Sequence, residues 1–283
     1  NIKSTLIDKK NLTVRVKNWF DFSDLNEYIL HWKVTGDDGT VLAEGNKEVA
    51  CEPHATVELT LGAVQLPKTI REAYLDLGWT RKKSTPLVDT AWEIAYDQFV
   101  LPASGKVWNG KPSEAGKTTF EVDENTGALK SLCLDGEELL ASPVTISLFR
   151  PATDNDNRDR MGAKLWRKAG LHTLTQKVVS LKESKTSATA QVNILNVTGK
   201  KVGDATLEYT LNHNGSLKVQ TTFQPDTTWV KSIARLGLTF EMNDTYGNVT
   251  YLGRGEHETY IDRNQSGKIG IYTTTPEKMF HYY

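Results

Sequence analysis

The stretch FRPATDNDN, residues 149–157, governs the interpretation of this chain, because it ends a strand-like apolar pattern with a dense polar run. A second run of the same kind, YLGRGEHETYIDR, follows at residues 251–263. Charged side chains are rarely buried unless they are paired. Each run is therefore interpreted either as a solvated turn or as an internally hydrogen-bonded polar corner, set in an otherwise β-rich sequence.

Period-two alternation of apolar residues is typical of β-strands and runs through the N-terminal part of the chain. The sets that share one face of a predicted strand are Leu12, Val14 and Val16; Tyr28, Leu30, Trp32 and Val34; and Val57, Leu59 and Leu61. Short strands separated by Gly- and Pro-containing turns predict an antiparallel sandwich with Trp32 near its centre. No cysteine pair accompanies this Trp, so we expect an Ig-like sandwich without the Ig disulfide.

The length of 283 residues exceeds what one hydrophobic core usually serves, which favours two domains. A segment rich in Pro, Gly and Ser changes the composition at residues 104–117 and is the predicted linker. The predicted domains are 1–103, an Ig-like β-sandwich, and 118–283, a second β-rich domain. Residues 166–171 are the one stretch of the second domain for which a helical turn is expected, so the fold class is all-β.

One hairpin can be predicted in register. A two-residue turn at Asn214 and Gly215 would pair Leu211 with Lys218 and mix apolar and charged residues on one face. A three-residue loop, 213–215, pairs Leu211 with Leu217 and keeps that face apolar. Since a one-residue slip inverts both faces of a strand, the three-residue loop is predicted, with Gly215 in the left-handed conformation.

The charge balance excludes several classes of function. Lys and Arg number 34 and Asp and Glu 35, so the formal net charge is −1. Proteins that bind nucleic acid or anionic membranes need a basic excess, so neither partner is expected. No apolar run approaches the roughly twenty residues of a membrane span. The seven Trp, ten Tyr and eight Phe can build packed cores and argue against disorder.

The two cysteines, Cys51 and Cys133, are expected to fall in different domains and to be free thiols, and two cysteines do not make a metal framework. The chain opens on Asn1 without a Met and ends on the aromatic run 280–283. Both ends are interpreted as cuts in a longer protein.

The pair Glu256 and Glu258 is the tempting candidate for catalysis. Residues two apart on a strand point the same way, about 6.5–7 Å apart, which lies between the separations of retaining and inverting glycosidases. Two neighbours on one strand cannot flank a scissile bond, however, so pairing with Arg254 or Arg263 is the preferred interpretation.

Calcium is the other chemistry that the polar runs suggest, at residues 154–157. The EF-hand pattern would then require an oxygen ligand at position 158, Gly at 159 and Glu at 165. The chain has Arg158, Asp159 and Leu165 there, so all three requirements fail. A hydrogen-bonded turn is preferred, with an unclassified cation site as the alternative. The six His show no metal-ligand spacing, and no nucleophile elbow, P-loop or dinucleotide fingerprint occurs.

The polar runs also carry a family resemblance. The segment RPATDND at 150–156, followed by Trp166 and AGL at 169–171, resembles the start of the C-terminal domain of glycoside hydrolase family 2 β-galactosidases. That family usually has R-A-P-T-D-N-D, and in this chain the Ala and the Pro are exchanged. GRG at 253–255, with the residues up to 263, is similar to that domain's G-R-G-P-x-E-x-Y-x-D-R, with Glu256 in place of the Pro. NWFDF at 18–22 and YILHW at 28–32 resemble the Ig-like domain that precedes it.

The resemblance implies that the chain supplies this Ig-like domain and the first part of a β-supersandwich similar to that of galactose mutarotases. It implies a parent that is a retaining β-galactosidase of terminal β-D-galactosides, with both catalytic glutamates on a (β/α)₈ barrel upstream of Asn1. The implied partners are that barrel, the galactoside bound by the parent, and further subunits of a homo-oligomeric parent. The chain itself is expected to hold no catalytic residue, metal or cofactor, since the parent's magnesium is bound mainly by the barrel.

The two polar runs are expected to form a network that shapes the wall of the parent's active-site cleft. Its predicted members are Arg150, Asp154, Asn155, Asp156, Arg254, Glu258, Asp262 and Arg263. If this is correct, substitution of Asp156 harms folding or assembly.

Two other functions are consistent with the same residues. One is a stand-alone carbohydrate-binding module, in which exposed Trp or Tyr residues and the run at Asp154 form the sugar site. The candidate stacking residues are Trp19, Trp108, Trp166 and Trp229, although a Trp in a β-domain more often belongs to the core. The other is a structural Ig-like surface protein without a ligand, which would continue past Tyr283 into further sandwich repeats.

Overall fold

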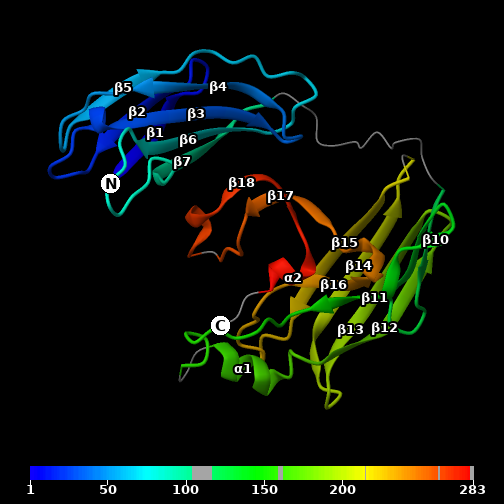
Figure 1. Cartoon of the computed structure of the whole chain (residues 1–283). Coiled ribbons are helices and arrows are strands. Elements are labelled where there is room, and N and C mark those ends of the chain that lie inside the picture. The colour runs from blue at the N-terminus through cyan, green and yellow to red at the C-terminus, as the bar shows by residue number, and fades with distance from the viewer. Residues whose placement is uncertain (104–116, 159–161, 214, 261, 281–283) are drawn as a thin grey trace. The chain divides into compact units, whose positions relative to one another are not determined.

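The computed structural model describes the chain except for residues 104–116, 159–161, 214, 261 and 281–283 (Figure 1). Strands make up most of the described structure, and the predicted all-β class is confirmed. Contacts divide the chain into two compact units, Asn1–Trp108 with Asn248–His281, and Asn109–Gly247 with Tyr282–Tyr283. The domain limits 1–103 and 118–283 stay a prediction, and the linker 104–117 falls almost entirely outside the described residues.

The first unit contains two antiparallel sheets. Three strands form one sheet in the order β1-β2-β5, and four form the other in the order β4-β3-β6-β7 (Figure 1). The strands are β1 (Ile2–Asp8), β2 (Thr13–Asn18), β3 (Tyr28–Gly36), β4 (Val41–Glu48), β5 (Thr56–Thr60), β6 (Ala73–Arg81) and β7 (Glu93–Leu101), with a 3₁₀ turn at Leu25–Glu27.

The inner faces of these two sheets share one hydrophobic core. Leu12, Val14 and Val16 are at most 1% exposed, as the alternation predicts. The Trp at the centre of this core is Trp79 on β6, which is 1% exposed. Trp32 was predicted for that place but is only partly buried at its margin.

A hairpin of distant sequence belongs to the same unit. Strands β17 (Val249–Gly255) and β18 (Lys268–Thr274) pair with each other, with a 3₁₀ turn at Asn264–Ser266 between them and helix α2 (Pro276–Met279) after them. The amide of Gln98 on β7 holds this hairpin, because its Nε2 donates to the carbonyl of Ile269 at 2.8 Å and its Oε1 accepts from the N–H of Ile269 at 2.7 Å. One side chain thus replaces a pair of strand-to-strand hydrogen bonds.

The second unit is also built from two antiparallel sheets. One has the order β10-β9-β11-β16 with β8 paired to β9, and the other has the order β12-β13-β14-β15 (Figure 1). The strands are β8 (Thr118–Val122), β9 (Leu129–Leu134), β10 (Glu137–Glu138), β11 (Leu140–Ser147), β12 (Leu174–Glu183), β13 (Ser187–Asn196), β14 (Lys201–Leu211), β15 (Leu217–Pro225) and β16 (Gly237–Met242). Helix α1 (Gly162–Ala169) overlaps the predicted helical turn 166–171 but begins four residues earlier, and a 3₁₀ turn covers Asp244–Tyr246. Residues 166–171 are not the one helical stretch of 118–283, because α2 was not predicted.

One core fills this second sandwich, and residues from both sheets and from α1 contribute to it. Strands β14 and β15 pair Leu211 with Leu217 and Tyr209 with Val219, and Gly215 has a φ of 78°. The predicted register of this hairpin is therefore confirmed, although residue 214 itself lies outside the described residues.

Cys51 and Cys133 are free thiols, as predicted, and one lies in each compact unit. Cys51 is 5% exposed, and burial raises the pKa of its thiol. Cys133 is only partly buried. Within the part of the chain that the structure describes, no helix has the length and apolar character that crossing a membrane requires.

Candidate functional site

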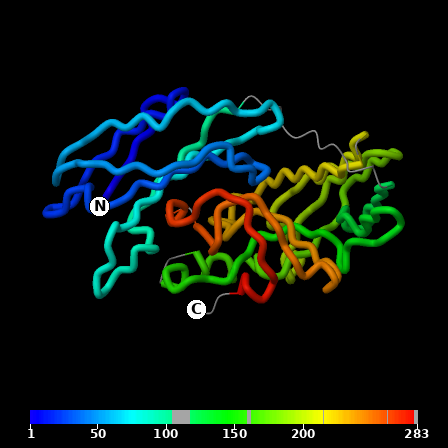
Figure 2. The backbone as a smooth tube through the Cα atoms, turned by 45° about the horizontal axis from the view of Figure 1, so that its top comes forward, coloured from blue at the N-terminus to red at the C-terminus, as the bar shows by residue number. Residues whose placement is uncertain are grey.

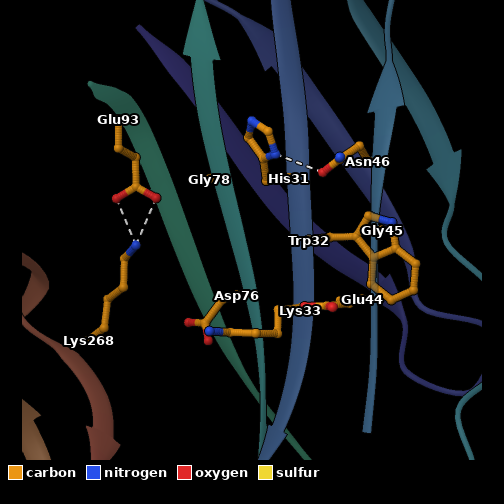
Figure 3. Close-up of a pocket in the computed structure, with 10 residues that line it drawn as sticks. All are labelled: His31, Trp32, Lys33, Glu44, Gly45, Asn46, Asp76, Gly78, Glu93 and Lys268. Atoms are coloured by element: carbon orange, nitrogen blue, oxygen red, sulfur yellow. Dashed lines mark hydrogen bonds and ion pairs between the residues drawn. The ribbon is translucent and has the colours of Figure 1, made fainter. Parts of the chain in front are cut away.

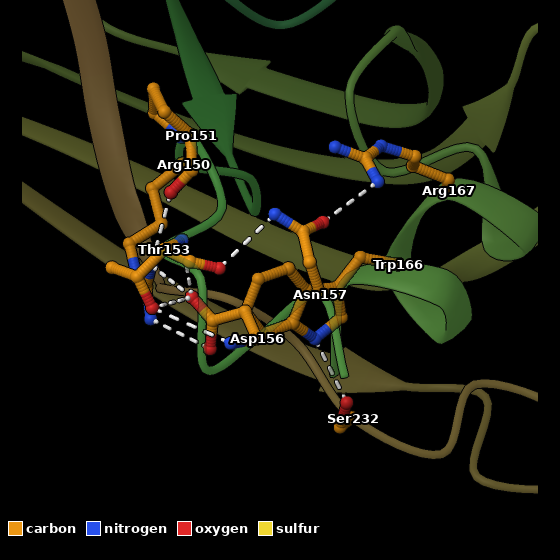
Figure 4. A network of polar contacts seen from close by, with 8 residues as sticks. All are labelled: Arg150, Pro151, Thr153, Asp156, Asn157, Trp166, Arg167 and Ser232. Carbon is orange, nitrogen blue, oxygen red and sulfur yellow. Dashed lines mark hydrogen bonds and ion pairs between the residues drawn. The ribbon is translucent and has the colours of Figure 1, made fainter. Parts of the chain in front are cut away.

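Asp156 is the centre of the polar corner that follows β11. Its carboxylate accepts two hydrogen bonds from the Arg150 guanidinium, from NH1 to Oδ2 at 2.7 Å and from NH2 to Oδ1 at 3.3 Å (Figure 4). Arg150 also donates to the carbonyl of Pro151 at 3.0 Å. A two-point pair of this kind fixes both side chains in one orientation.

The same carboxylate closes a tight turn with Thr153. The backbone N–H and the hydroxyl of Thr153 each donate to Asp156 Oδ2 at 2.9 Å. Burial raises the pKa of Asp156, but the hydrogen bonds from Arg150 and Thr153 outweigh it and leave the pKa below its ordinary value. The run at 154–157 is thus a hydrogen-bonded turn.

Trp166 on α1 joins the corner to the core of the second unit. It is 5% exposed, and its Nε1 donates to the hydroxyl of Ser232 at 2.9 Å (Figure 4). The Arg150 guanidinium lies over its ring, 5.2 Å from the centroid, and Phe149 meets it edge-on at 6.4 Å. The N–H groups at the edge of the Arg150 guanidinium therefore donate to the turn, and the face of the guanidinium packs on Trp166.

The outer part of the corner contains residues that the sequence did not single out. The amide of Asn157 donates to the carbonyl of Thr153 at 3.1 Å and accepts from Arg167 at 3.2 Å (Figure 4). Asp154 and Asn155, which were predicted members of the network, have exposed side chains. A hydroxyl residue three positions before a carboxylate, as Thr153 is to Asp156, was the available signal for the closed turn.

The second polar run lies in the first unit. Arg254 on β17 donates to the carbonyls of Asn264 and Gly267 at 3.1 and 3.0 Å, and so braces the loop that connects β17 to β18. Asp262 and Arg263 are exposed in this loop, and Glu258 is partly buried.

Glu256 and Glu258 come after the last residue of β17. The strand geometry assumed for this pair was therefore wrong. The two polar runs lie in different compact units, and the single network of eight residues stays a prediction.

A polar groove of about 520 Å³ lies on the outer face of the four-stranded sheet (Figure 3). Register places Asn46, His31, Gly78 and Tyr96 in one row across four neighbouring strands. Gly78 contributes no side chain to the floor, and the Glu93 carboxylate lies where a side chain at Gly78 would be.

The polar groups of the groove are held by neighbours. His31 bonds to Asn46 Oδ1 at 2.7 Å and to the Thr80 hydroxyl at 2.9 Å, and Glu93 pairs with Lys268 on β18 at 2.7 Å (Figure 3). Burial raises the pKa of Asp76, partly offset by a hydrogen bond that Gln98 donates to it. Charged side chains of both signs line the groove.

The candidate sugar-stacking tryptophans differ in exposure. Trp166 belongs to the core, whereas Trp19 is 57% exposed. Trp229 is partly buried with its Nε1 donating to the carbonyl of Lys201, and Trp108 lies outside the described residues. No group of three or more His, Cys, Asp or Glu within the described ranges is arranged to hold a metal ion.

Two family models match the chain. The model described as "Beta galactosidase small chain" matches residues 114–283, and the one described as "Beta-galactosidase, domain 4" matches residues 14–102. The division between the two matches falls in the segment predicted as the linker.

Curated relatives agree with these models. A β-galactosidase of Priestia megaterium is 28% identical over 96% of this chain, and one of Actinobacillus pleuropneumoniae is 24% identical over 98%. The chain spans only 28% and 29% of the lengths of these two relatives. A solved exo-chitosanase of Amycolatopsis orientalis is 12% identical with a TM-score of 0.29 over 86% of this chain and 26% of that one, a likeness too weak to carry an argument. The chain belongs to the β-galactosidase small-chain family and corresponds to a part of the β-galactosidases that it matches.

Proposed function

We propose that this chain is the non-catalytic C-terminal portion of a retaining β-galactosidase that hydrolyses terminal β-D-galactosides such as lactose. The observation that carries the proposal is the coverage of the relatives. About 96% of this chain aligns with a β-galactosidase of which it makes up only 28%. The remaining length of such a protein has room for a catalytic barrel, whereas the part of this chain that the structure describes is built from antiparallel sheets.

The work of the chain in this proposal is architectural. Its two sandwiches pack against the barrel, contribute to the wall of the active-site cleft and take part in contacts between subunits. The rigid corner around Arg150 and Asp156 supports this role, because bidentate pairing and stacking on Trp166 hold a polar surface in a fixed position. The second run, braced by Arg254, is assigned the same role.

The magnesium ion implied for the parent is assigned to residues outside this chain. Such an ion takes carboxylate and water oxygens in an octahedral arrangement, usually with few protein ligands. It would stabilise the active site of the parent without ligands from the corner or the groove.

Hydrolysis of a chromogenic β-galactoside tests the proposal. The chain alone, the rest of its parent alone and the two co-expressed are compared at equal concentration. We expect activity only from the combination. Clear activity of the chain alone would contradict the proposal, and Glu256→Gln and Glu258→Gln variants would then identify the catalytic pair.

Carbohydrate binding by the isolated chain is the second candidate, and the groove at His31 is the observation in its favour. Fixed imidazole, amide and carboxylate groups at its rim match the alternating donors and acceptors of a sugar. Titration of the chain with galactose and lactose, followed by calorimetry, tests it. Binding that is lost in His31→Ala but kept in Asp244→Asn, a control at an exposed position outside the groove and the polar runs, would support this candidate, and absence of any binding would exclude it.

A further inference from the structure

One end of the first sandwich gathers three separate segments of the chain. The N–H of Trp19 donates to the carbonyl of Asn1 at 2.7 Å, and the N–H of Lys82 donates to the carbonyl of Glu27 at 3.0 Å. These bonds bring the start of β1, the loop 19–27 and the loop 82–92 to the same end of the sheets (Figures 1 and 2).

The loop after β2 presents large apolar side chains to solvent from a fixed backbone. Phe22 is 96% exposed and Trp19 is 57% exposed. Beneath them, the fully buried amide of Asn18 donates to the carbonyls of Ser23 and Cys51 at 2.9 Å each. Phe20, between the two exposed rings, stacks on Tyr28 with centroids 5.3 Å apart. The outward direction of Phe22 therefore follows from a loop that is anchored on both sides.

The loop between β6 and β7 also presents large apolar side chains to solvent from a fixed backbone. Leu87 is 94% exposed and Trp92 is 68% exposed. The Thr85 hydroxyl accepts hydrogen bonds from the N–H groups of Leu87 and Val88 at 3.4 and 3.0 Å, and the Thr85 N–H donates to the carbonyl of Val88 at 2.9 Å. This closed turn holds Leu87 at its tip.

Trp19, Phe22, Leu87 and Trp92 are together called the apolar end. Their exposed surface contributes little to the stability of this chain and would contribute to stability if a partner buried it. Exposed apolar patches bordered by charges mark interaction sites, and aromatic anchors carry most of the binding energy of such sites. The border here includes the Asp21 carboxylate, which lies 3.1 Å from His54 Nε2, and Lys17, whose ammonium lies 5.2 Å from the Trp19 ring centroid.

We propose that the apolar end is the docking surface for the rest of the parent β-galactosidase, the polypeptide that precedes Asn1. This inference rests on the proposed function. Most of the length of the matched relatives lies outside this chain, so a partner of sufficient size belongs to the same protein. Asn1 is held beside Trp19 by its own carbonyl, so a polypeptide joined to its amino group begins next to the apolar end.

The test compares the intact parent enzyme with the isolated chain, each carrying Phe22→Ser with Leu87→Ser. A matched control carries Val179→Ser with Val197→Ser, two valines of the second unit that are 61% and 71% exposed. In the parent, the docking variant is expected to lower the midpoint of thermal unfolding by about 1.5–3 °C, the shift that loss of two buried apolar side chains causes in a protein more than three times as long as this chain. In the isolated chain its unfolding midpoint stays within about 1 °C of wild type, and the control changes neither value.

An unchanged midpoint of the parent carrying the docking variant would overturn the inference. A lowered midpoint of the isolated chain would also overturn it, since the side chains would then serve the fold of this chain. Sedimentation of the wild-type chain measures whether a second copy of the chain occupies the apolar end. A dimer that Phe22→Ser dissociates would overturn the inference, because the occupant would then be a second copy. If the parent hydrolyses no β-galactoside, the proposed function fails, while its thermal midpoints still measure the docking surface.

Discussion

Asp156 accepts four hydrogen bonds, two from Arg150 and two from Thr153, and its replacement removes all of the charge-assisted ones at once. Asp156→Asn is expected to lower the free energy of unfolding of the second unit by about 1–3 kcal/mol. Urea denaturation at neutral pH measures this. Asp154→Asn, at an exposed position of the same turn, is the control and should stay within about 0.5 kcal/mol of wild type. An Asp156→Ala parent enzyme that is stable and fully assembled would contradict the predicted role of the corner.

The pH dependence of that difference has a definite sign. Folding lowers the pKa of Asp156 below its ordinary value of 3.8. A group whose pKa is lowered stabilises the fold above its unfolded pKa and loses this contribution as the pH falls through its folded pKa. The stability gap between wild type and Asp156→Asn is therefore expected to be constant near neutral pH and to shrink below about pH 4. A gap of unchanged size in acid would show that ionisation plays no part.

Sequence reasoning located the polar corner and chose Asp156 for substitution, but it gave Asp154 and Asn155, which are exposed, the same place in the network. Asp154, Asn155 and Asp156 are consecutive polar residues, and which of them turns inward depends on the backbone direction after Pro151. The Thr153 turn sets that direction, and the spacing of Thr153 and Asp156 was its available signal. Ser232 was not foreseen as the partner of Trp166, because 66 residues separate the two in sequence.

At the scale of elements, the turn between β8 and β9 packs against β13. Gly127 has a φ of 70°, and a side chain there would lie 2.7 Å from Ala190 Cβ and 2.8 Å from Val192 Cγ1. Gly199 has nearly the same φ, 76°, but faces open space. Gly199→Ala is expected to cost about 1–2 kcal/mol for its backbone alone, and Gly127→Ala about 1–3 kcal/mol more for overpacking. Chemical denaturation measures both losses. An equal loss of unfolding free energy in Gly127→Ala and Gly199→Ala would show that β13 shifts to accommodate the new side chain without cost.

Elements with a clean alternation were predictable, and those without it were not. The hairpin of β14 and β15 follows from the requirement that Leu211, Tyr209 and their partners share one face. Strand β6 is buried on most of its length, so the near-continuous apolar run YLDLGW has no period-two signal, and Trp79 was missed as the central Trp. The place of the β17–β18 hairpin is set by side-chain contacts from β7, namely the Gln98 amide and the Glu93 carboxylate, and no local pattern marks them.

At the scale of the whole molecule, two separate hydrophobic cores predict two unfolding transitions. Leu75 in the first unit and Leu148 in the second are both 0% exposed. Leu75→Ala is expected to destabilise the first unit by about 2–5 kcal/mol and to leave the other transition unchanged, and Leu148→Ala should do the reverse. Differential scanning calorimetry separates the two. A single transition that moves with either substitution would mean that the units unfold together.

The distribution of the two cysteines has a practical consequence. Each sandwich carries one sulfhydryl, so a thiol-specific reagent added to the native chain reports on both without any engineered label. Cys133 is partly accessible and should be alkylated promptly, whereas Cys51 reacts only in the fraction of molecules in which its own sandwich has opened. The alkylation rate of Cys51 therefore measures how often the first sandwich opens at the end that bears Phe22. A partner bound at that end would lower this rate.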